Sequence, residues 1–143
     1  MNNQYDPEID VLIENVVQSG SHYRTAEMDR LYTDDQAILF VDANGTVKRA
    51  ARAAMMEEFA ARGAARELPL STEYRVLHVE QQVDQAAAIL FRRMSPINPA
   101  AMYELRLRKE GRAWKVAGET VMAWPTAEDG NDFLPPRSDQ DRS

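Results

Sequence analysis

Three aspartates flank a short apolar run near the start of the chain, and one of them is a candidate general base. The stretch "LYTDDQAILFVDANG", residues 31–45, carries Asp34 and Asp35 before the run and Asp42 after it. A carboxylate is an effective base at neutral pH only when its surroundings raise its pKa. Asp42 shares one face of an extended segment with Phe40, so an inward-facing strand would place this carboxylate at the mouth of a pocket.

The same aspartates also have a purely structural interpretation. Asp42 precedes the turn-forming pair Asn44 and Gly45, where a carboxylate accepts hydrogen bonds from turn amides. The other two fit an exposed corner between a helix and a strand. We favour the structural interpretation and keep one alternative, in which Asp42 is catalytic and Tyr103 faces it as a hydrogen-bond donor.

A further acid, Glu119, lies in the small and mostly apolar stretch "KVAGETVMA". It alternates with Ala117, Val121 and Ala123, so one interpretation buries it in the protein. The other places it on a rim or dimer face, paired with an arginine such as Arg106. We favour the second interpretation.

No residue pattern in the chain predicts a cofactor. The chain has no cysteine, and its two histidines, His22 and His78, have no neighbours at metal-ligand spacing. A nucleophile elbow and a glycine-rich phosphate loop are both missing from the sequence. We therefore expect no metal, NAD, ATP or covalent catalysis.

Aromatic and methionine side chains give the stronger functional signal. Such side chains either fill a core or line a pocket for a flat molecule. The filled core is favoured for Met55 and Phe59. The candidate ligand-binding residues are Tyr32, Phe40, Met55, Phe59, Tyr103, Glu119 and Trp124.

These side chains must be positioned by an N-terminal helical region. Asp6 is a good N-cap and Pro7 suits the first helical turn. An apolar stripe with helical spacing follows, and Gly20 is expected to end the helix. A short second helix is expected after a cap at Thr25. The stripe consists of Ile9, Leu12, Ile13, Val16 and Val17.

Strands and a third helix are expected next. Residues 36–42 form a strand, and the Asn-Gly pair predicts a type I′ turn that returns the chain through residues 46–48. Residues 49–62 are rich in helix formers. Strands with turn signals between them follow at residues 73–83, 86–94, 101–109 and 112–124. The segregation of helices and strands predicts an α+β domain over residues 1–125, followed by a polar, mobile tail at 126–143.

Composition limits the classes of partner. The chain has 143 residues, enough for one domain, and a net charge of −6, which argues against binding to nucleic acid. It contains no secretory signal pattern and no apolar run long enough to cross a bilayer. We therefore expect a cytoplasmic protein with no nucleic-acid or membrane partner.

Three motifs in a fixed order give the chain a family resemblance. They are "LYTDD" at 31–35, "DANG" at 42–45 and "GRAWKV" at 111–116. In this order the chain resembles the nuclear-transport-factor-2-like (NTF2-like) superfamily, also called SnoaL-like or ketosteroid-isomerase-like, over roughly residues 5–125. A "Ser-Gly" near the first helix end and the strand "YELRL" resemble the lumazine-binding branch of that superfamily.

The resemblance implies a cystatin-like half-open cone, with three N-terminal helices packed in a curved, mostly antiparallel sheet. It also implies an apolar pocket for a small apolar or heteroaromatic molecule, and a homodimer formed through the outer sheet face. We place Val121 and Ala123 on that dimer face, because they would otherwise lie bare. The superfamily includes binding proteins, isomerases, dehydratases and cyclases, so membership alone names no reaction.

Ketosteroid isomerase itself is a poor match. That enzyme combines an aspartate base with a tyrosine and a protonated aspartic acid. Aligned through "LYTDD", the tyrosine falls at Val16 and the neutral acid near Tyr103. The base falls at Phe40, or at Asp42 if the strand is shifted by two residues. Because two of these roles are lost or changed, we do not expect that activity.

Overall fold

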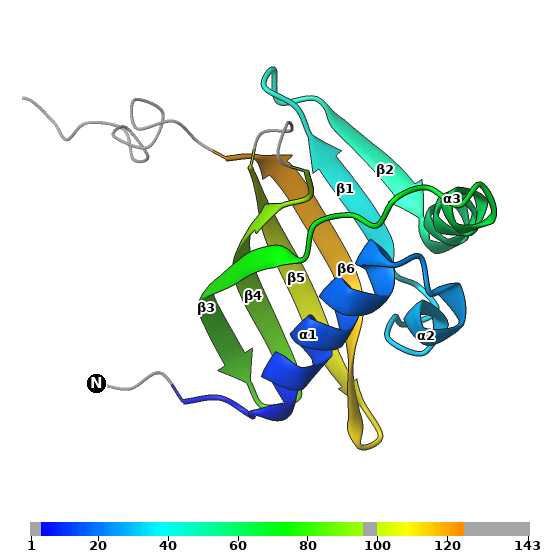
Figure 1. Cartoon of the computed structure of the whole chain (residues 1–143). Coiled ribbons are helices and arrows are strands. Elements are labelled where there is room, and N and C mark those ends of the chain that lie inside the picture. The colour runs from blue at the N-terminus through cyan, green and yellow to red at the C-terminus, as the bar shows by residue number, and fades with distance from the viewer. Residues whose placement is uncertain (1–3, 96–99, 125–143) are drawn as a thin grey trace, which may run out of the picture.

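The computed structural model describes residues 4–95 and 100–124, so the predicted tail at 126–143 lies outside the described residues. Within them the helices and strands form an α+β arrangement, with two helices first, one helix after the second strand and four consecutive strands at the end (Figure 1). In chain order the elements are α1 (Glu8–Ser21), α2 (Thr25–Asp29), β1 (Ala37–Val41), β2 (Val47–Ala51), α3 (Arg52–Ala64), β3 (Glu73–Gln82), β4 (Gln85–Arg93), β5 (Ala101–Glu110) and β6 (Ala113–Ala123).

The strands form one six-stranded sheet in the order β2-β1-β6-β5-β4-β3. Every neighbouring pair is antiparallel except β1 and β6, which are parallel. Helix α1 crosses one face of the curved sheet (Figure 1). Only α1 and α2 precede the sheet; α3 follows β2 and packs against the β1–β2 edge, so the expectation of three N-terminal helices needs this correction.

Helix α1 carries the predicted apolar stripe, all of it buried against the sheet. It begins at Glu8, whose backbone N–H donates to Asp6 Oδ1 at 2.9 Å. The helix runs past Gly20 to Ser21, contrary to the prediction. The left-handed residue that follows it is Tyr23, with φ of 57°.

The β1–β2 hairpin forms, but its turn is not type I′. That turn needs positive φ at both central residues, and only Gly45, at φ 82°, has one. The loop is closed by Gly45 N–H donating to Asp42 O at 3.0 Å. Strand β2 then pairs with β1 as far as Ala51, so α3 begins three residues later than residue 49, where we expected it.

The strands β3 to β6 lie within one residue of their predicted ends. The inner face of these strands packs on α1 and forms the core, which includes Trp114 and Val116 of β6. Register brings Leu105 opposite Glu119 on one side, and Ile38 opposite Glu119 on the other. Among the described residues, no helix has the length and apolar character needed to cross a membrane.

Candidate functional site

A cavity of about 340 Å³ lies between α1, α3 and the inner face of the sheet. Its walls are mainly apolar, with a few polar side chains among them. Ligand pockets in proteins commonly combine an apolar wall with a few polar groups, and this volume lies at the lower end of their range. The lining residues are Val16, Val17, Gly20, Tyr32, Ile38, Phe40, Met55, Glu58, Phe59, Arg62, Leu70, Leu90, Arg92, Met94, Tyr103, Leu105, Glu119 and Val121.

Glu119 is a buried carboxyl group in this wall. It is 5% exposed, and Gln36 Nε2 donates to its Oε2 at 3.0 Å. Burial raises the pKa of Glu119 to about 7, although Arg92 and the Gln36 hydrogen bond act in the opposite direction. The favoured sequence interpretation, an acid paired with Arg106 at a rim, is wrong, because Arg106 binds Glu104 at 2.6 Å.

A break in the alternation of β6 explains this outcome. Arg106 pairs with Gly118, whereas the next residue of β5, Leu107, pairs with Val116, which leaves Ala117 as an extra residue. Such a bulge moves the residues after it to the opposite face. Glu119 therefore shares the inner face with Val116.

Gln36 holds the Glu119 carboxyl from the segment before β1. It is 1% exposed, and its Nε2 also lies 3.7 Å from Met55 Sδ. Within the described residues its Oε1 has no hydrogen-bond partner. Rotation of the amide would offer an acceptor to a protonated Glu119, so Gln36 is suited to both protonation states.

Arg92 brings a buried cation to the same cavity. It is 6% exposed on the inner face of β4, and its Nη2 donates to Ser21 Oγ at 2.8 Å and to Ser71 O at 3.3 Å. Both partners are neutral, and Arg92 Nε has no partner among the described residues. Burial lowers the pKa of Arg92.

The sequence interpretation missed both Arg92 and Gln36. For Arg92 a signal was present, because the arginine alternates with Ala88 and Leu90 on the apolar face of its strand. Gln36 offered no such signal, since it precedes β1 and its burial arises only when β6 lies alongside.

Two tyrosines complete the polar part of the wall. Tyr103 donates to Met94 Sδ at 3.5 Å, and burial raises its pKa to about 12. Burial also raises the pKa of Tyr32 well above its usual value. Both hydroxyl groups therefore remain protonated at neutral pH and can act as hydrogen-bond donors.

Asp42 lies outside this cavity, in the hairpin loop. Its Oδ1 accepts from the backbone N–H of Asn44 and of Thr46, each at 2.9 Å, which is the structural role favoured from the sequence. It borders a second hollow at the β1–β2 edge, and that hollow does not include Tyr103. The geometry therefore does not bring Asp42 and Tyr103 together. The strand ends at Val41, so the inward alternation does not reach Asp42.

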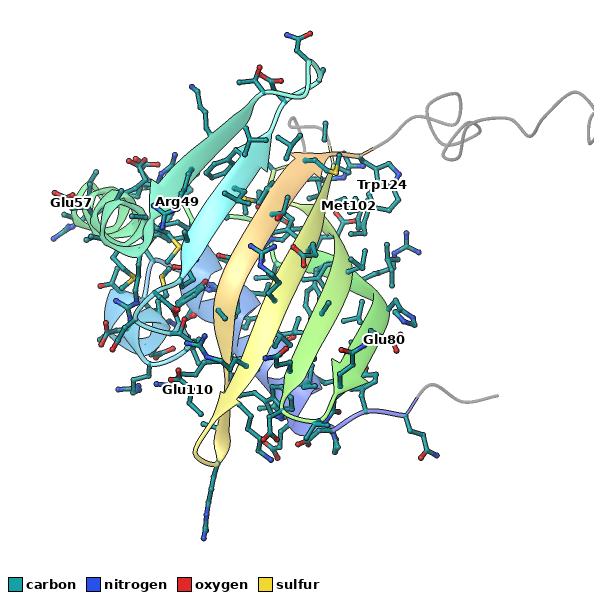
Figure 2. All side chains as sticks on the ribbon, turned by 180° about the vertical axis from the view of Figure 1, so that it is seen from behind. Arg49, Glu57, Glu80, Met102, Glu110 and Trp124 are labelled. Atoms are coloured by element: carbon teal, nitrogen blue, oxygen red, sulfur yellow. The ribbon has the colours of Figure 1, made fainter. Side chains whose placement is uncertain are left out.

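The remaining candidates divide between the two faces of the sheet. Tyr32, Phe40, Met55 and Phe59 line the cavity together with Tyr103 and Glu119. Trp124 does not: its ring packs edge-on against Phe91, with centroids 5.2 Å apart, on the outer face. Figure 2 shows Trp124 beside Met102 on that side of the sheet.

The histidines lie apart from the cavity wall. His22 contacts Gln18 O at 2.8 Å, and His78 Nε2 lies 2.8 Å from Glu80 Oε1. Over residues 4–95 and 100–124, no group of three or more His, Asp or Glu side chains is arranged to hold a metal ion.

Comparison with known proteins identifies the fold. No family model matches the chain, and no curated protein matches its sequence. Solved structures do: an NTF2-like protein of unknown function from Silicibacter pomeroyi has a TM-score of 0.67 at 13% identity, covering 82% of this chain and 93% of that one.

Two further bacterial structures agree. An NTF2-like protein of unknown function from Shewanella baltica has a TM-score of 0.67 at 13% identity, over 87% of this chain and 100% of that one. One from Methylobacillus flagellatus has a TM-score of 0.64 at 12% identity, over 82% and 90%. These likenesses define a scaffold and leave its use to the residues in the cavity.

Proposed function

Taking the NTF2-like fold as the scaffold, we propose that this chain binds a small, largely apolar or heteroaromatic molecule in the cavity beneath α1. The observation that carries this proposal is Arg92, a buried guanidinium in the cavity wall that forms no ion pair with a carboxylate of the described residues and whose Nε has no hydrogen-bond partner among them. Buried polar atoms in folded proteins almost always have partners. A molecule bound against this guanidinium would compensate its buried charge, and the apolar wall would hold the rest of the molecule.

A dye-binding experiment tests this proposal. We expect the neutral naphthalene dye prodan to bind with a blue shift in emission, because the wall is mainly apolar. The substitution Val121→Phe adds bulk inside the cavity and should weaken binding at least about tenfold. Val11→Phe is the matched control, since Val11 is 50% exposed. Equal affinity of both variants and the wild type would rule out binding in this cavity.

Acid–base catalysis is a second candidate function, favoured by Glu119. A carboxyl group with a pKa of about 7 is half ionised at neutral pH, which suits a general base. Tyr103 lines the same cavity and offers a donor for a developing oxyanion. We therefore assign the base of an isomerase, dehydratase or cyclase type of reaction to Glu119 in place of Asp42.

Deuterium exchange distinguishes this candidate from simple binding. In heavy water, we expect the wild type to accelerate exchange of the α-protons of 2-acetylnaphthalene, as a carboxylate base removes a proton and returns a deuteron. Glu119→Gln should reduce the accelerated rate by at least about a hundredfold. Asp42→Asn should leave it within a few-fold. An acceleration that survives Glu119→Gln would remove Glu119 as the base.

We also propose that a second copy of the chain covers the outer face of the sheet. We inferred this interface from Val121 and Ala123, but Val121 faces the cavity instead. Support now comes from an apolar row that crosses neighbouring strands, followed at β3 by Arg75, whose guanidinium lies 5.1 Å from the centroid of the Phe91 ring. In strand order, the row is Val47, Val41, Met122, Met102 and Phe91.

A further inference from the structure

Arg92 is held in one orientation inside the cavity wall. Ser21 at the end of α1 and Ser71 before β3 both accept hydrogen bonds from its Nη2. These two segments are themselves joined, because Leu70 N–H donates to Ser21 O at 2.9 Å. The guanidinium is thus fixed by backbone-anchored groups and cannot turn toward solvent without breaking both bonds.

This cation has no anionic partner within the described residues. Arginine is rarely buried unless it is paired, because an isolated charge in an apolar environment loses its hydration. Here Ser21 Oγ and Ser71 O, the acceptors of its Nη2 hydrogen bonds, are neutral, no described carboxylate forms an ion pair with Arg92, and its Nε–H has no acceptor among the described residues. The guanidinium therefore retains both charge and donor capacity for something else.

Glu119 does not cancel this charge fully. Its carboxyl group faces the same cavity, but burial favours its neutral form. The tyrosines that couple to Arg92 are neutral. Several charged and titratable groups line the cavity or interact electrostatically with Glu119, Arg92 or Tyr32. They are Arg92 of β4, Tyr103 and Arg106 of β5, Tyr32 before β1, Tyr74 of β3, and Arg52, Glu58 and Arg62 of α3.

We propose that the cavity binds an organic acid as its anion, with the carboxylate on Arg92 and a flat apolar body along the wall. This inference rests on the proposed binding function and specifies its ligand class. A carboxylate accepts charge-assisted hydrogen bonds from a guanidinium, which are about twice as strong as neutral ones. The apolar body has Leu90 and Val17 in the same wall to contact.

Binding of the anion is coupled to a proton on Glu119. A second negative charge in the cavity disfavours ionised Glu119, so the anion binds the protonated protein better. Affinity for the acid is therefore highest below about pH 7 and falls by about tenfold between about pH 6 and 8. A neutral ligand of the same shape lacks this dependence.

A matched ligand pair tests the inference by titration calorimetry. The probes are 2-naphthoate and its neutral isostere 2-naphthamide. At about pH 6 we expect the acid to bind at least about tenfold more tightly. Arg92→Met should remove this preference while keeping the side chain's bulk. Arg93→Met is the control, because it removes the same charge from the outer face of the same strand. Glu119→Gln should keep the preference and remove the pH dependence.

Equal affinity for acid and amide in the wild type would overturn the inference without relying on any variant. So would a preference for the acid that persists in Arg92→Met. If prodan binds but neither naphthyl compound does, the organic-acid inference fails and the binding function stands. If none of the three compounds binds, both fail.

Discussion

Glu119 shows how a single buried carboxyl group couples the site to pH. In the folded protein its pKa is raised from the usual 4.5 to about 7. The folded state therefore holds a proton that the unfolded chain releases at lower pH. The contribution of Glu119 to stability is therefore greatest below the unfolded pKa, falls as pH rises from about 4.5 to about 7, and is constant above that range.

Replacing this group should remove that slope. We expect urea unfolding to show that the wild type loses about 2 to 3 kcal/mol relative to Glu119→Gln between about pH 5 and 8. The variant keeps an acceptor for Gln36 and has no proton to release. Glu57→Gln, on the exposed face of α3, should track the wild type at every pH. A constant difference between the wild type and Glu119→Gln across this range would mean that Glu119 is ionised in the folded state.

In the β1–β2 hairpin, a residue that contributes to stability lies apart from the cavity in which we propose that a ligand binds. Asp42 satisfies two loop amides, so it closes the hairpin at a point away from the cavity that contains Glu119. Its contribution belongs to local backbone geometry. An effect on binding would have to pass through β1, which supplies Ile38 and Phe40 to the wall.

We expect Asp42→Ala to lower the free energy of unfolding by about 1 kcal/mol, the usual effect of losing a capping carboxylate. Prodan affinity should stay within a few-fold of the wild-type value. The control is Asp34→Ala, which removes an exposed aspartate from the corner before β1 and should change stability by less than about 0.5 kcal/mol. A large loss of affinity in Asp42→Ala, with stability unchanged, would contradict the capping role.

Over the whole molecule, the two faces of the sheet carry different side chains. The inner face supplies the cavity and its buried charges, and the outer face carries the apolar row to which Met102 belongs (Figure 2). A stable protein–protein interface buries on the order of 1,200–2,000 Å². A row that spans the sheet from β2 to β4 gives a second copy a broad surface to cover.

Light scattering tests this arrangement. We expect the wild type to have the mass of two chains at micromolar concentration, and Met102→Arg to have the mass of one, since it would bury an unpaired charge within the row. Leu68→Arg introduces the same charge at a residue that is 87% exposed, and should leave the dimer intact. A wild type with the mass of one chain would exclude the outer-face dimer.

Local physics made most of the elements predictable from sequence. The apolar stripe of α1, the alternation of β5 and the turn residues act within a few residues, so the sequence by itself determined the α+β order and strand positions. Errors arose where neighbours intervene. Pairing with β1 extended β2 into the predicted third helix, and Tyr23 replaced Gly20 as the left-handed residue after α1.

Only the tertiary structure decided which charged groups share the cavity. The bulge at Ala117 turned Glu119 inward, and this depends on how β6 pairs with β5. Gln36 reaches Glu119 from 83 residues away in sequence, and Arg92 reaches Ser21 from 71. Sequence patterns report which side chains avoid water. Contacts between segments that are distant in the chain decide on which face of the sheet each side chain of a strand lies. They therefore also decide which buried charged groups lie close together.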